Sequence, residues 1–130
     1  MKIGDTTVAR GSVEIEWCAQ SRVAIVRYAP DTSLTAPDGK FLVDSLNGWI
    51  GSEGEPLAVL AFAGEVRDTD AGYRAIASGF FRQHRATVRL ALVDAGAIVT
   101  VVSEMFRVAT GIQLKGFKDE GAARAWLATS

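Results

Sequence analysis

The sequence predicts a single α/β domain with a mostly parallel central sheet, an edge hairpin strand and about four helices. Short, continuously apolar runs are typical of buried parallel strands, and here they alternate with stretches of helical periodicity about 10–15 residues long. This alternation implies right-handed crossovers between parallel strands. The 130 residues contain no linker, repeat or low-complexity segment, so they suit one apolar core.

Residues 1–11 are interpreted as an N-terminal tail of a domain that spans residues 1–130. The first expected strand, Ser12–Trp17, alternates between apolar and acidic residues, which indicates a half-solvated strand at or near an edge. The apolar run RVAIVRYA follows after a short polar link, so the two are expected to pair as a hairpin. Because so regular an edge strand invites pairing, the sequence also predicts a homodimer.

The next expected element is an amphipathic helix. Thr35 and Asp38 have the spacing of a capping box, Pro37 is tolerated in a first helical turn, and Gly51 is a natural end. The run Leu57–Phe62 is then short and entirely apolar, which is typical of a central parallel strand covered on both faces.

The second half of the sequence repeats this alternation. A helix is expected from Ala71, followed by a buried strand over Val88–Val93. Asp94 is expected to cap a third helix that closes at Gly111. A short strand, IQLKGF, and a last helix, DEGAARAWLA, complete the predicted order β-β-α-β-α-β-α-β-α.

Composition restricts the class of protein. The net charge is -1 and no Lys/Arg run reaches four residues, so a nucleic-acid partner is not expected. Cys18 is the one cysteine, which fits a reducing compartment and disfavours a zinc site. The N-terminus lacks the apolar core of a signal peptide, and no apolar run approaches the roughly 20 residues of a membrane span. We therefore expect a cytoplasmic protein with no metal and no cofactor.

Several segments together resemble the STAS domain family, the sulfate-transporter and anti-sigma-factor-antagonist domains. They are RVAIVRYA, LAVLAF with the DTDAG turn, TVRLALVD, and the ending VSEMFRVATGI followed by FKDEGAARAWL. The resemblance spans roughly Val13 to Leu127 and is nearest to small stand-alone bacterial members. It implies a regulatory protein that is not an enzyme and that binds a protein partner, such as an anti-sigma-type kinase or another regulator. The same layout also resembles the lipid-binding Sec14-like fold.

The DTDAG turn corresponds to the strand-to-helix turn of switch-type STAS domains. In those domains the turn resembles Asp-Ser/Thr-Ser-Gly, and its second hydroxyl residue is phosphorylated. Asp68 and Thr69 match that pattern, but Asp70 stands at the phosphoacceptor position and Gly72 comes one residue late. The turn is therefore predicted to lack a working phospho-switch, with Asp70 as a fixed helix cap. The candidate partner- or anion-binding residues are Glu65, Asp68, Thr69, Asp70, Gly72 and Tyr73. The alternative is that Thr69 or Asp70 is only an N-cap.

No catalytic residue is predicted. Glu65 and Asp68 could form a carboxylate pair, but their sequence neighbourhood supplies no nucleophile or oxyanion site. Nothing local suggests a triad of Cys18, His84 and Asp94. His84, between Arg82 and Arg85, either complements a helix C-terminus or belongs to a small anion-binding patch.

Several large apolar residues are expected in the core or as half-buried anchors. These are Trp17, Trp49, Trp126, Met105 and Phe106, with Trp49 and the third helix as alternative partner contacts.

The sequence supports two hypotheses of function. The first is a non-enzymatic regulatory protein-interaction module that uses the Glu65–Gly72 turn. The alternative is a small-ligand or lipid binder with an apolar pocket between helices and sheet.

Overall fold

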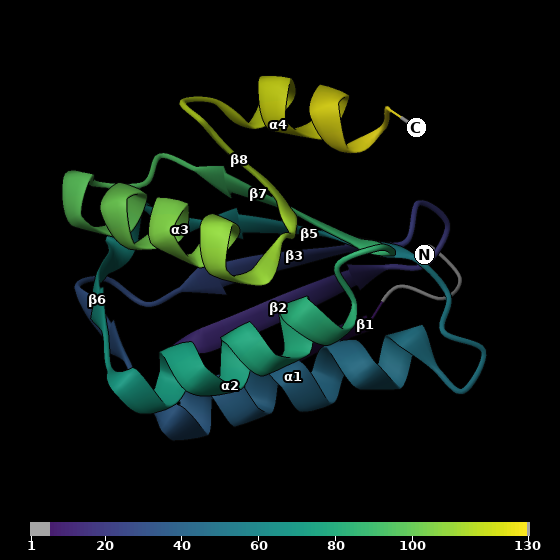
Figure 1. Ribbon diagram of the computed structural model, residues 1–130, viewed down its shortest axis with the longest axis horizontal. Helices are drawn as coiled ribbons and strands as arrows, with labels where there is room; N and C mark the ends of the chain where they lie inside the picture. The colour runs from purple at the N-terminus through teal and green to yellow at the C-terminus, as the bar shows by residue number, and fades with distance from the viewer. Residues whose placement is uncertain (1–5, 130) are drawn as a thin grey trace.

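The computed structural model describes residues 6–129, apart from the side chains at positions 97, 98 and 102. These residues form one α/β domain (Figure 1). Its elements are β1 (Thr6–Arg10), β2 (Val13–Cys18), β3 (Val23–Tyr28), β4 (Thr32–Leu34), α1 (Ala36–Ile50), β5 (Leu57–Phe62), a 3-10 turn (Ala63–Glu65), β6 (Val66–Thr69), α2 (Ala71–Gln83), β7 (Val88–Val93), α3 (Ala97–Thr110), β8 (Gln113–Phe117) and α4 (Glu120–Leu127).

The main sheet has the order β1-β2-β3-β5-β7-β8. β1, β2 and β3 are antiparallel, whereas β3, β5, β7 and β8 run parallel. As predicted, Leu57–Phe62 and Val88–Val93 are parallel neighbours, with Leu57 opposite Val88. Separately, β4 and β6 form a small parallel pair beside the main sheet.

Helices cover both faces of the sheet. The larger apolar cluster lies against α1, α2 and α3, and a smaller cluster lies under α4. Figure 1 shows α4 above the sheet, with α1 and α2 below it. Leu60, whose exposed fraction is 0%, belongs to the α4 cluster, whereas its neighbour Val59 faces the other helices. This explains why β5 is apolar along its whole length, since its side chains alternate between two covered faces.

The N-terminal tail prediction is wrong for Thr6–Arg10, because these residues form β1, which pairs antiparallel with β2. β1 is mostly exposed and only Val8 is half-buried, so its sequence gives almost no apolar signal. Ser12–Trp17 is therefore covered on its outer side, and β1 is the edge strand. The homodimer was predicted from a free edge at Ser12–Trp17, and β1 occupies that edge. The homodimer therefore stays a prediction.

Helix boundaries agree with the sequence prediction at two positions and differ at a third. Thr35 and Asp38 form the predicted capping box of α1, and Asp38 accepts a hydrogen bond from the Thr35 backbone N–H at 2.9 Å. Gly111 ends α3 in the left-handed conformation, as predicted. The prediction that Asp94 caps α3 is wrong, because the N-cap is Gly96. Asp94 instead has φ 58 and lies against Gly64, so the chain turns before the helix begins.

Two glycines let α1 and α2 approach each other closely. A Cβ on Gly72 would lie 2.8 Å from the Ala36 Cβ, and a Cβ on Gly39 would lie 3.2 Å from a ring carbon of Tyr73. Real side chains do not tolerate the first of these distances. Gly72 therefore serves the packing of the two helix starts, which fixes where the β6–α2 turn lies.

Candidate functional site

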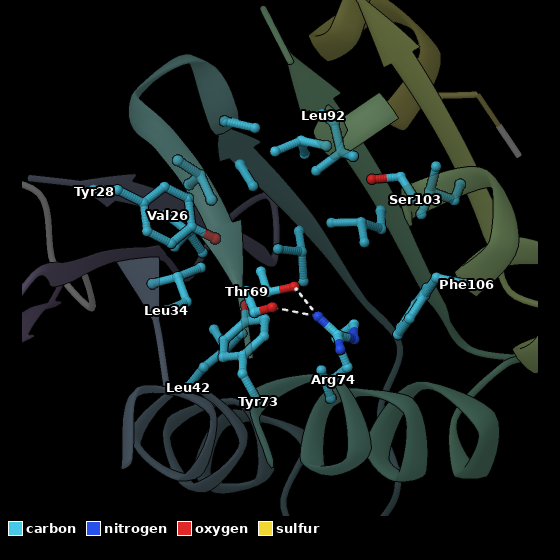
Figure 2. Close-up of a pocket in the computed structure, with 18 of the residues that line it drawn as sticks. Val26, Tyr28, Leu34, Leu42, Thr69, Tyr73, Arg74, Leu92, Ser103 and Phe106 are labelled. Atoms are coloured by element: carbon cyan, nitrogen blue, oxygen red, sulfur yellow. Dashed lines mark hydrogen bonds between the residues drawn. The ribbon is translucent and has the colours of Figure 1, made fainter. Parts of the chain in front are cut away.

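An apolar cavity of about 190 Å³ lies between the sheet, β6, α2 and α3 (Figure 2). Its strand wall comes from β3, β5, β7 and β8, and Ala77 and Phe81 of α2 and Phe106 of α3 close the helix side. Apolar cavities of comparable size accept apolar molecules such as benzene.

Small residues keep this space open. Ala61 and Ala63 project from the end of β5 and the following 3-10 turn, and Ala77 faces them from α2. Each of the three is almost fully buried. In a close-packed interior these positions would ordinarily hold larger side chains that fill the void.

Two tyrosines form one wall of the cavity. Tyr28 ends β3 and Tyr73 lies in the first turn of α2, and their hydroxyl groups interact. Burial raises the pKa of Tyr28 well above 10.0, and the nearby Tyr73 and Asp38 add to the rise. Burial raises the pKa of Tyr73 to about 12; the hydrogen bond with Tyr28 opposes this rise, and Asp38 adds to it. Both phenols are therefore protonated at neutral pH and can donate hydrogen bonds.

Polar side chains form a rim on the cavity, and the rim consists of Asp68, Thr69, Arg74 and Ser103. Arg74 Nη1 donates to the Thr69 hydroxyl at 3.2 Å and to the Thr69 backbone carbonyl (Figure 2). Asp68 and Arg74 are both exposed. Within residues 6–129, Arg74 forms no ion pair with a carboxylate, and Asp68 forms none with a cation.

Of the six predicted site residues, Asp68 and Thr69 lie on this rim, and Tyr73 lies in the cavity wall. Asp70 is the N-cap of α2, and its carboxylate accepts the Tyr73 backbone N–H at 2.7 Å. Asp68, Thr69 and Tyr73 line the cavity itself. Glu65 lies outside the lining, where its carboxylate accepts the Asp31 backbone N–H at 3.4 Å.

The other candidates from the sequence lie apart from each other. Cys18 packs in the α4 cluster, whereas His84 lies beside Phe80 in the opposite cluster, with ring centroids 4.7 Å apart. Asp94 lies against Gly64 at the far end of β7. The three residues do not form a triad. Arg82 and Arg85 are exposed, whereas the His84 ring lies against Phe80.

Sequence reasoning missed Arg74, Tyr28 and Ser103. They come from three separate elements, and only the folded sheet places them around one space. The signal that could have found Arg74 is its position one helical turn after the Asp70 cap. That spacing places Arg74 next to the DTDAG turn, which the sequence predicts as the candidate site.

An exposed apolar stripe on α3 lies outside the cavity. Val101, Met105 and Val108 have exposed fractions of 61%, 68% and 72%. Met105 was expected in the core, and this expectation is wrong. Phe106 is half-buried as expected and packs edge-to-face on Phe81 at 5.5 Å. Trp17 and Trp49 stack with ring centroids 5.0 Å apart, so Trp49 is a packing residue rather than an exposed contact.

Residues 6–129 include no group of three His, Cys, Asp or Glu side chains placed to hold a metal ion. No helix among these residues is both long enough and apolar enough to cross a bilayer.

Comparison with known proteins identifies a family and two related folds. A family model described as SpoIIAA-like matches residues 25–128, while comparison with curated proteins found no match. An uncharacterized protein of the DUF3478 family with a SpoIIAA-like fold, from Shewanella loihica PV-4, is 15% identical with a TM-score of 0.69, over 98% of each chain. SiaC of Pseudomonas aeruginosa is 10% identical with a TM-score of 0.59, over 88% of this chain and 100% of that chain.

The two solved structures support the fold alone, because their sequences differ so much from this one. The family match is a separate observation and covers most of the sequence. It agrees with the STAS resemblance and with the predicted α/β architecture. The chain belongs to the SpoIIAA-like family.

Proposed function

We propose that the chain is a non-enzymatic regulatory module that binds a small apolar ligand in the cavity between α2, α3 and the sheet. The observation that carries this proposal is the cavity itself, which is about 190 Å³ in volume and lined mainly by hydrocarbon side chains. Ligand sites are typically apolar spaces with a few polar groups that orient the ligand, and the rim and the two tyrosines fit that description.

The volume limits the ligand. An engineered apolar cavity of about 150 Å³ in another protein holds benzene. The cavity described above is somewhat larger. It therefore suits a ring of benzene to indole size, or a chain of roughly six to eight carbon atoms. A regulatory rather than catalytic role is supported by the family and by the separation of Cys18, His84 and Asp94.

Filling the cavity from inside should abolish ligand binding. Ala77 faces the cavity, so we expect Ala77→Leu to weaken binding of indole and 1-octanol at least about tenfold, because the leucine side chain occupies the ligand's space. Isothermal titration calorimetry measures this. Ala75→Leu is the matched control, since Ala75 is exposed on the same helix. The proposal is wrong if neither probe binds the unmodified protein, or if both variants bind alike.

A second candidate function is a protein-interaction module resembling an anti-sigma-factor antagonist. It is favoured by the family and by the exposed α3 stripe, since α3 packs against β6, the strand that leads into the Asp68–Gly72 turn. In this function the turn and the stripe form one partner surface, and Asp70 supplies a fixed negative charge at the start of α2.

Substitution of Asp70 tests that surface. Asp70→Ala should lower the free energy of unfolding by about 0.5–2 kcal/mol, because the Tyr73 N–H loses its cap. Asp70→Ser should be milder for folding, because serine also caps, yet it should lose partner retention in a pull-down from the native host. Chemical denaturation and the pull-down measure the two effects. Unchanged stability and retention in Asp70→Ala, or stoichiometric phosphorylation of Thr69, would contradict the second function.

A further inference from the structure

The geometry of the rim points to a more specific ligand, and this inference rests on the proposed function. We propose that the ligand is an amphiphile with one carboxylate head group. Its apolar part fills the cavity and its head group binds Arg74. The partners of Arg74, the groups that orient it and the charge of Asp68 carry the argument.

Five of the ten arginines among residues 6–129 make an ion pair with a carboxylate, and Arg74 is not one of them. An ion pair with a carboxylate is made by Arg22, Arg27, Arg67, Arg107 and Arg124. Arg74 instead donates to two neutral acceptors, the hydroxyl and the backbone carbonyl of Thr69. Among residues 6–129, its positive charge at the cavity rim is therefore not held in an ion pair.

The bonds to Thr69 also orient the guanidinium. Both come from Nη1, so within the described chain the Nε and Nη2 edge is left without a hydrogen bond to protein. A guanidinium is planar, and a free edge of two N–H groups matches the two oxygens of a carboxylate. Since Thr69 already holds the side chain against the rim, little rotamer freedom is lost when an anion binds.

Asp68 is the opposing charge at the rim and bears on the kind of head group. An ionised carboxylate only accepts hydrogen bonds, so Asp68 would repel an anion but could attract an amine. No hydrogen bond from residues 6–129 holds the Asp68 side chain in place, whereas two hold Arg74. The oriented cation is therefore the stronger recognition element. A single negative charge also meets less repulsion from Asp68 than the double charge of a phosphate.

Three probes of equal chain length separate the head group from the apolar tail. We would titrate octanoate, 1-octanol and octylamine into the protein at neutral pH by calorimetry. Octanoate should bind roughly tenfold or more tightly than 1-octanol, as a charge-assisted bidentate hydrogen bond allows. Arg74→Gln should remove this preference, because it lowers the affinity for octanoate far more than the affinity for 1-octanol. Asp68→Asn should strengthen octanoate binding, because it removes the repelling charge.

The controls keep the outcomes distinct. Arg82→Gln removes an exposed arginine from the last turn of the same helix and should leave all three affinities unchanged. Arg74→Lys keeps the positive charge but loses the bidentate geometry of the guanidinium. Its octanoate affinity should therefore lie between that of the unmodified protein and that of Arg74→Gln. Equal binding of octanoate and 1-octanol, or tighter binding of octylamine, overturns the carboxylate inference and leaves the cavity function standing. Failure of all three probes to bind overturns both.

Discussion

Leu60→Ala should be the most destabilising substitution considered, lowering the free energy of unfolding by about 2–5 kcal/mol. Leu60 is fully buried between the sheet and α4, where its cluster includes Ile25, Ala91 and Ala123. Truncation removes three buried carbon atoms and leaves a void that the strands on either side cannot collapse, because both are hydrogen-bonded to β5. The loss is large because Leu60 is fully buried where α4 packs on the sheet.

Urea or guanidinium denaturation measures this loss, provided that the slope with denaturant stays constant. Leu60→Met is the matched control, because it nearly conserves volume and should cost less than about 1.5 kcal/mol. A loss below about 1 kcal/mol in Leu60→Ala would show that the position is not closely packed.

Gly72→Ala should also destabilise the protein, by about 1–3 kcal/mol, although alanine is ordinarily the better helix former. The added Cβ would lie 2.8 Å from the Ala36 Cβ, so the starts of α1 and α2 would have to move apart. Such a movement would also displace Tyr73, which lies in the cavity wall one residue later.

A glycine in the same helix provides the comparison. A Cβ on Gly79 meets nothing within 4 Å, so Gly79→Ala should stabilise the protein by about 0.5–1 kcal/mol. Adding Ala36→Gly to Gly72→Ala removes the clashing carbon and should recover much of the lost stability. Thermal and chemical denaturation of the four proteins would test this. Equal stabilisation by both glycine substitutions would mean that the helices are not in close contact at Gly72.

Most of the fold could be predicted because its signals are local. The apolar runs of β5 and β7, the Thr35–Asp38 capping box and the closing Gly111 each depend on residues within one element. β1 was missed because an edge strand with most of its side chains in solvent has no apolar periodicity to detect. The Asp94 cap was wrong because the turn before α3 depends on contact with Gly64, about thirty residues earlier.

The candidate site could be predicted only in part. The turn that holds Asp68, Thr69 and Tyr73 has a recognisable sequence, and these residues do lie on the cavity. The cavity has no sequence signal of its own, since alanines in a strand and a helix read as ordinary core residues. Tyr28 joins Tyr73 only because β3 ends beside α2 in the folded protein. The exposed position of Met105 likewise depends on which face of α3 meets the sheet.

The three alanines around the cavity have a consequence for the lifetime of the protein. A space of about 190 Å³ that opens to solvent on one side forgoes packing energy of at most about 4 kcal/mol. That amount is comparable to the whole stability of many small domains, about 5–15 kcal/mol. A bound ligand restores part of it by mass action, so empty molecules unfold more often than occupied ones. Since proteases act on unfolded chains, the amount of this protein in a cell would rise and fall with the supply of its ligand.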